Sequence, residues 1–182
     1  MGFLTKFFGA VPWEERHGIH LDTMKPFWEV DGKFDFPTLL RCLRGLLPER
    51  SILYFEDGSP DGSLAEFLRA HSVPEHAHLA NGTIRPRPAI YHLPATPDVL
   101  VRLADEMECR ATPELAIHFH VYCDQVVLLE WHDAFFQPML LSGGLQEQQV
   151  KEFCERANLR YAYWKDSEEL TAAQIRKFLG KS

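Results

Sequence analysis

The apolar and polar positions of the chain alternate between helical and extended periods. Leucines recur every three to four residues after Pro37, which predicts a helix that ends near Pro48. Residues 51–55 are almost wholly apolar, as in a strand covered on both faces. The same reading predicts further helices at about 63–71, 97–107, 145–157 and 171–179, and strands at about 89–93, 115–122, 126–133, 138–141 and 159–163.

This order of elements predicts one α/β domain over residues 1–182, with an α+β domain as the alternative. We expect a mixed sheet of about five to six strands, with helices packed on it and a β-hairpin at 115–133. Residues 1–36 are rich in aromatic side chains but have no sustained period, so we interpret them as an N-terminal arm packed on the domain. The loop 74–88 is long enough to be a lid or a contact surface.

The hairpin supports the sharpest geometric prediction. Its odd positions are apolar on both strands, whereas the even positions carry His118 and His120 on the first strand and Glu130 and His132 on the second. Both apolar sets stay on one face only if even positions pair with even positions. We therefore expect a three-residue loop at 123–125 that places His118 opposite Glu130.

Three imidazoles and one carboxylate on one face form the kind of ligand set that holds catalytic zinc and non-heme iron. One interpretation is a single divalent transition metal ion bound by His118, His120, Glu130 and His132, in which Glu130 is a ligand or the catalytic general base. The other is an ordinary polar sheet face with cross-strand contacts and no cofactor. The spacing alone does not separate the two, because no stronger metal-binding motif accompanies it.

Composition and charge narrow the class of protein. The chain has 182 residues, 46% of them hydrophobic and 25% charged, which is typical of an ordinary globular domain. Its net charge of -7 disfavours nucleic acid and anionic membranes as partners. The four cysteines form no C-x-x-C pair, and no apolar run is long enough for a membrane span. We therefore expect a cytoplasmic protein with reduced thiols.

The acidic residues are concentrated in one stretch of the chain. Asp105, Glu106 and Glu108 crowd the C-terminal end of a predicted helix, where negative charge is unfavourable, and Glu114 follows closely. We therefore predict a non-catalytic protein-binding or regulatory module, such as an inhibitor or antitoxin, that presents this acidic surface to a basic protein partner. The alternatives are a purely solubilising face and, for the protein as a whole, a small metal-dependent hydrolase that uses the hairpin.

Overall fold

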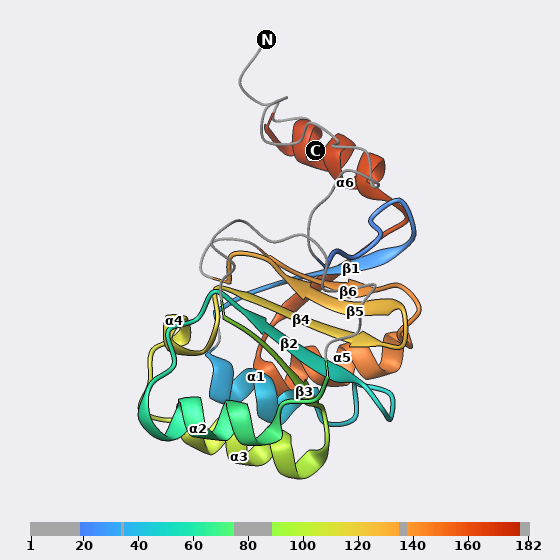
Figure 1. Cartoon of the computed structure of the whole chain (residues 1–182). Helices are drawn as coiled ribbons and strands as arrows, with labels where there is room; N and C mark the ends of the chain where they lie inside the picture. Colours follow the sequence, from blue (N-terminus) through green and yellow to red (C-terminus); the bar gives the residue numbers. More distant parts are fainter. Residues whose placement is uncertain (1–18, 34, 75–88, 135–137, 179–182) are drawn as a thin grey trace.

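Seven strands form one sheet at the centre of the computed structural model, which describes residues 19–33, 35–74, 89–134 and 138–178 (Figure 1). The strands are β1 (Phe27–Asp31), β2 (Ile52–Glu56), β3 (Ile90–Pro94), β4 (His118–Cys123), β5 (Val126–Trp131), β6 (Met139–Ser142) and β7 (Arg160–Trp164). They lie in the order β3-β2-β4-β5-β6-β1-β7. The helices are α1 (Phe36–Leu43), α2 (Gly62–His71), α3 (Pro97–Met107), α4 (Thr112–Leu115), α5 (Glu147–Ala157) and α6 (Ser167–Phe178).

The predicted single domain of helices packed on a sheet is confirmed, and it is of the α+β kind. The sheet has seven strands rather than five to six, and every pairing among the described strands is antiparallel rather than mixed. Element order alone does not fix strand direction, because a helix and its loops can return the chain to either end of the sheet. The order of elements therefore could not predict that the described strands all pair in antiparallel directions.

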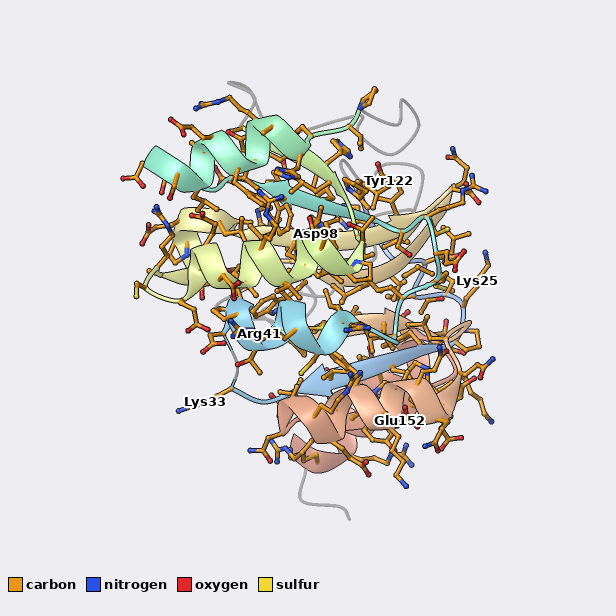
Figure 2. The ribbon with its side chains drawn as sticks, turned by 90° about the horizontal axis from the view of Figure 1, so that it is seen from below. Lys25, Lys33, Arg41, Asp98, Tyr122 and Glu152 are labelled. Atoms are coloured by element: carbon orange, nitrogen blue, oxygen red, sulfur yellow. The ribbon has the colours of Figure 1, made fainter. Side chains whose placement is uncertain are left out.

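Helices α1, α2, α3 and α5 cover one face of the sheet, which Figure 2 shows from the helix side. Their apolar sides pack against the apolar positions of the strands, and Phe36 lies at the centre of this core with no exposed surface. Its ring centroid is 5.5 Å from that of Phe119 and 5.6 Å from that of Trp131. This face is filled by aliphatic and aromatic side chains, so the titratable groups of the sheet collect on the opposite face.

The opposite face of the sheet carries a smaller apolar cluster beside those polar groups. Its buried members are Ile19, Leu21, Phe27, Tyr54, Tyr122 and Val127. Helix α6 lies on this side, above the end of β1 (Figure 1), and the amide of Ser167 donates to the carbonyl of Thr23 at 2.9 Å. The residues that precede β1 thus lie across the face opposite the four helices.

At the histidines the predicted hairpin register is wrong by two residues, although the predicted face of these histidines and of Glu130 is correct. His120 rather than His118 lies opposite Glu130, because a bulge adds one residue to β5 and the turn contains only residues 124–125. Asp124 takes a left-handed backbone conformation there, with φ 52°, which aspartate tolerates better than most residues. A shift of two keeps even positions on one face, so the histidines and the glutamate still share it.

A β-bulge in the hairpin was not visible in the sequence. Val121 pairs with Leu129 and Tyr122 with Val127, which leaves Leu128 as the extra residue on β5. Val127 therefore lies on the same face as Tyr122 and not on the helix side, where the alternation placed it. The first strand also begins later than predicted, because residues 112–115 form α4.

Part of the predicted N-terminal arm belongs to the sheet itself. Strand β1 lies between β6 and β7, and Phe27 pairs with Ser142 on one side and Trp164 on the other. The remainder of the arm at 1–18 lies outside the described residues, as do residues 75–88 of the long loop. Within the described part of the chain, every helix is too short or too polar to cross a bilayer.

Candidate functional site

We call the group formed by His20, His118, His120, Glu130 and His132 the histidine face. Four of its members come from the hairpin. His118 and His120 lie on β4, Glu130 lies opposite His120 on β5, and His132 follows the end of β5. The fifth, His20, comes from the residues before β1. All four hairpin residues are those that the sequence predicted as candidate metal ligands, and the structure keeps them on one side of the sheet.

His120 is the buried centre of this group. Its relative exposure is 2%, and it lies between Tyr54 on β2 and Glu130 on β5. Neither ring nitrogen has a hydrogen-bond partner among the described residues. Burial lowers the pKa of His120 to about 3, against the opposing effect of the Glu130 charge, so the ring is neutral at neutral pH.

Glu130 is ionised although it lies largely under other atoms. Burial raises its pKa, but the hydrogen bond from His20, the neighbouring His120 and the amide of Leu21 together outweigh burial and bring the pKa below its usual value. The Nδ1 atom of His20 is 3.5 Å from Oε1 of Glu130, and the Leu21 amide donates to Oε2. His20 and Leu21, which precede β1, therefore both bind the carboxylate of Glu130 on β5.

His118 and His132 stack on each other at the open side of the group. Their ring centroids are 4.2 Å apart and the rings are nearly parallel, at 11°. The amide of Asp133 donates to Nδ1 of His118 at 3.0 Å, so the neutral ring carries its proton on Nε2. Partial burial lowers the pKa of His118. His132 is exposed, which opens the histidine face to solvent on this side.

A row of polar aromatic side chains continues from His120 towards the edge of the sheet. Tyr54 lies between His120 and His92 in the register, and its hydroxyl donates to Glu56 at 2.5 Å. The hydroxyl of Tyr122 lies 2.9 Å from Nδ1 of His92. No sequence signal places His20, Tyr54 and His92 in this region. Strand pairing brings Tyr54 and His92 beside the hairpin, and the chain before β1 brings His20.

The side chains of the histidine face do not converge on one point as they stand. Among the described residues, no group of three or more His, Cys, Asp or Glu side chains is arranged to hold an ion. The backbone spacing is nonetheless suitable, because directly paired Cβ atoms lie about 4.5–5.5 Å apart and diagonal ones roughly 7–8 Å.

The carboxylates of the predicted acidic surface have basic or hydroxyl partners in the structure. Arg41 of α1 reaches Asp105 at 2.9 Å and Glu108 at 2.6 Å, and these bonds raise the pKa of the arginine. Arg41 thus offsets part of the negative charge at this helix end. This pairing could not be predicted from the sequence, because Arg41 and Asp105 are 64 residues apart.

The other two predicted acidic residues also have partners. Arg110 bonds to Glu114 at 2.9 Å and to Asp61 at 2.8 Å, and the hydroxyl of Ser63 donates to Glu106 at 2.7 Å. The four predicted acids line one side of an open cavity of about 440 Å³. Around it, five carboxylates share two arginines, so an excess of negative charge remains at the surface.

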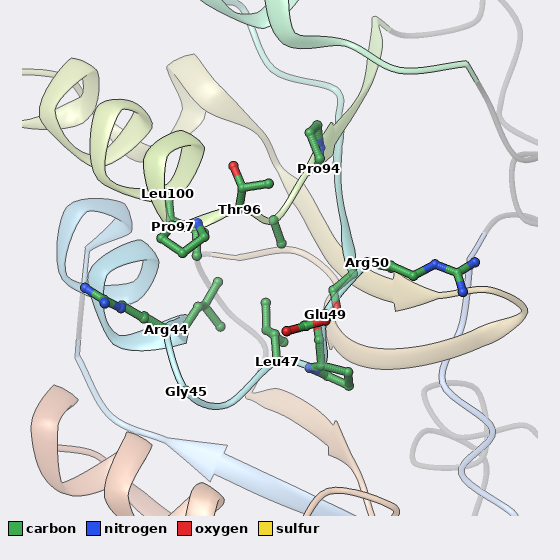
Figure 3. Close-up of a pocket in the computed structure, with 13 residues that line it drawn as sticks. Arg44, Gly45, Leu47, Glu49, Arg50, Pro94, Thr96, Pro97 and Leu100 are labelled. Atoms are coloured by element: carbon green, nitrogen blue, oxygen red, sulfur yellow. Dashed lines mark hydrogen bonds between the residues drawn. The ribbon is translucent and has the colours of Figure 1, made fainter.

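A separate cavity of about 270 Å³ opens where the ends of α1 and β3 meet the start of α3 (Figure 3). Its walls are mostly apolar and include Leu47, Pro94 and Leu100. The guanidinium of Arg50, at its rim, is held by Asp124 at 3.2 Å. The residues that line this cavity include no histidine or cysteine, so it provides packing surface rather than a cluster of reactive groups.

Comparison of the chain with known protein families, with curated proteins and with solved structures found no match in any of the three.

Proposed function

We propose that the protein binds one divalent transition metal ion on the histidine face, through His120, Glu130 and His132, and that it acts as a small metal-dependent hydrolase. The observation that carries this proposal is the state of His120, whose two buried ring nitrogens lack hydrogen-bond partners among the described residues. A buried polar group left in this way costs about 1–3 kcal/mol. A bound metal ion would give a ring nitrogen of His120 a partner, and the same ion could bind the neighbouring carboxylate of Glu130.

The chemistry of the three residues supports a transition metal rather than a harder cation. Imidazole nitrogen suits zinc, iron and copper, whereas magnesium and calcium prefer oxygen ligands. One carboxylate and two imidazoles make a set that leaves a coordination position for water. The exposed side at His132 provides access for such a water and for a substrate.

In this proposal, His118 is not a ligand of the metal ion. Its Nδ1 accepts from the Asp133 amide, which leaves the proton on Nε2 and no free lone pair for a metal. The ring instead lies flat against His132 and orients it. We therefore expect removal of His118 to weaken metal binding less than removal of His120 or Glu130 does, in the way that outer-shell residues act.

Zinc titration of untagged protein by calorimetry tests the proposal. The wild-type chain should bind one ion, and His120→Gln and Glu130→Gln should each weaken the affinity by more than about tenfold. His71→Gln is the matched control, because His71 lies at the end of α2 against Phe67 and away from the site. Absence of zinc binding by the wild type, or equal binding by all four proteins, would contradict the proposal.

We also propose, as a second function, that the acidic cavity contacts a basic protein partner. Its support is the excess of five carboxylates over two arginines around an open hollow. Affinity for such a partner should fall as salt rises and on the double change Glu106→Lys and Glu108→Lys. A partner whose affinity is unaffected by both changes does not bind through this surface.

A further inference from the structure

We infer that β7 is the docking edge for a second copy of this chain, so that two β7 strands pair antiparallel around Ala162 and join two sheets into one. β7 is the last strand of the sheet, and it pairs with β1. Among the described residues, no backbone hydrogen bond reaches its outer side. Such an edge leaves alternate N–H and C=O groups available to another strand.

The opposite edge of the sheet is partly covered by the backbone of the same chain. The amide of Val73, which follows α2, donates to the carbonyl of His92 on β3 at 2.8 Å. A sheet edge whose backbone groups are occupied in this way is protected from pairing with another chain. The two edges of the sheet therefore differ, and β7 is the one that offers its backbone.

β7 and α6 bury unusually little of their surface in one copy of the chain. Of the described helices and strands, only these two contain no side chain that the structure describes as buried. Ile175 of α6 is 51% exposed. By contrast α5, of nearly the same length, buries four side chains. Such a segment is expected where packing is completed by an assembly, because an isolated helix of twelve residues is marginal in water.

The side chains of β7 suit contact with another strand. Tyr161 and Tyr163 are 36% and 47% exposed, and both lie on the helix side of the sheet. Their ring centroids are 5.9 Å and 4.7 Å from that of Trp28, which supports both rings from β1. Edge strands that avoid pairing commonly carry lysine, proline or a bulge. β7 has none of these along its five residues.

The charges along this edge balance, although the whole chain has a net charge of -7. Residues 27–31 and 160–165 together carry two bases and two acids. Arg160 bonds to Asp31 at 2.5 Å, and the indole N–H of Trp164 donates to Glu29 at 2.9 Å. Two copies can therefore approach along β7 without a like-charge repulsion between these residues.

The strand is complementary to itself in one register that overlaps all five residues. A two-fold axis normal to the sheet keeps each side chain on its own face, so odd positions must meet odd positions. With Ala162 opposite its own copy, Tyr161 lies opposite Tyr163 of the partner subunit, and the reverse. On the other face Arg160 lies opposite Trp164 of the partner subunit, where a guanidinium can lie over an indole ring.

Analytical ultracentrifugation of the full chain over a range of concentrations tests this pairing. The wild type should form a dimer of twice the 21.0 kDa of one chain and dissociate on dilution. Tyr161→Lys with Tyr163→Lys places like charges opposite each other and should raise the dissociation constant of the dimer by more than about tenfold. Tyr161→Lys with Tyr163→Glu also removes both tyrosines but places opposite charges there, so it should dimerise at least about tenfold more tightly than the first variant.

A control variant and a second measurement accompany this comparison. Val101→Lys with Val126→Lys adds the same charge at two exposed apolar residues away from β7 and should dimerise like the wild type. Amide exchange of residues 160–164 in the wild type should slow by more than about tenfold between the monomeric and dimeric concentrations. Circular dichroism of each variant shows that the fold is retained.

A wild type that stays monomeric would overturn the inference and leave this edge to an extended peptide of another protein. A dimer that both tyrosine variants weaken equally does not pair in the stated register, and one that the valine variant weakens as much as the double lysine variant does not use β7. Each of these results also contradicts the inference. The metal site is tested separately by zinc titration, so the two proposals can fail independently.

Discussion

His120 is a histidine in a core position, and its burial affects stability as well as the proposed chemistry. Its pKa is about 3 in the folded chain and 6.5 in an unperturbed side chain. Between these values the unfolded state binds a proton that the folded state does not. The stabilisation is therefore complete above pH 6.5 and is lost as pH falls towards 3.

We expect the free energy of unfolding to fall by about 2 kcal/mol between pH 7 and pH 5 because of His120 alone. The charged and titratable groups that influence His120 are Glu130, His20, His118 and His132. His118 also has a lowered pKa and adds to the loss, whereas the pKa of Glu130 lies below its usual 4.5 and outside this window. Urea unfolding of metal-free wild type and His120→Gln at both pH values measures the difference. Equal losses in the two proteins would contradict the burial of this ring.

Gly58 is a second residue whose neighbours make a clear prediction. A Cβ atom added there would lie 2.0 Å from the carbonyl oxygen of Leu115, which is backbone and cannot move aside cheaply. Gly58→Ala should therefore destabilise the fold by about 2 kcal/mol or more. At Gly62 an added Cβ meets nothing within 4 Å, and only the φ of 46° opposes it, so Gly62→Ala should cost about 1 kcal/mol. Thermal unfolding compares them, and equal costs would argue against the close approach at Gly58.

At the scale of single elements, local signals located the longer helices but not all of their ends. Helix α1 ends at Leu43 rather than near Pro48, and α6 begins at Ser167 rather than at 171. Asn158 ends α5 in a left-handed conformation, with φ 55° and ψ 47°, as asparagine and glycine commonly do after a helix. The alternation in 115–133 correctly placed the histidines and Glu130 on one face. It could not reveal the bulge at Leu128, because residues 126–129 are all apolar and fit either phase of the alternation. Strand β1 was missed because its five residues have no clear alternation and it pairs only with distant strands.

The beginning of α1 gives a prediction at the element scale. The Oδ1 atom of Asp35 accepts from the Thr38 amide at 2.8 Å, and this bond brings the pKa of Asp35 below its usual value. Asp35→Ala should reduce the free energy of unfolding by about 1 kcal/mol. Asp61 begins α2 without such a bond and is 81% exposed in its ion pair with Arg110. Asp61→Ala should cost less than about 0.5 kcal/mol in the same urea experiment, and a reversed order would contradict the assignment of the cap.

For the whole molecule, the sheet separates two environments. One face is an apolar core under four helices, and the other collects histidines, tyrosines and glutamates from β2, β3, β4 and β5. The sequence predicted the hairpin part of this second face. It could not predict the place of His20 or the pairing of Arg41 with Asp105, because those contacts join residues more than 60 positions apart.

Binding of one ion to the folded chain alone should raise the stability of the whole molecule. The gain is RT ln(1 + [L]/Kd), which is about 2.7 kcal/mol when free zinc is one hundred times its dissociation constant. The most direct test of the metal site is urea unfolding of the untagged chain with and without zinc, in wild type and in His120→Gln. The account predicts a zinc-dependent gain in the wild type that is lost in the variant. Unfolding curves that zinc does not shift in the wild type would contradict it.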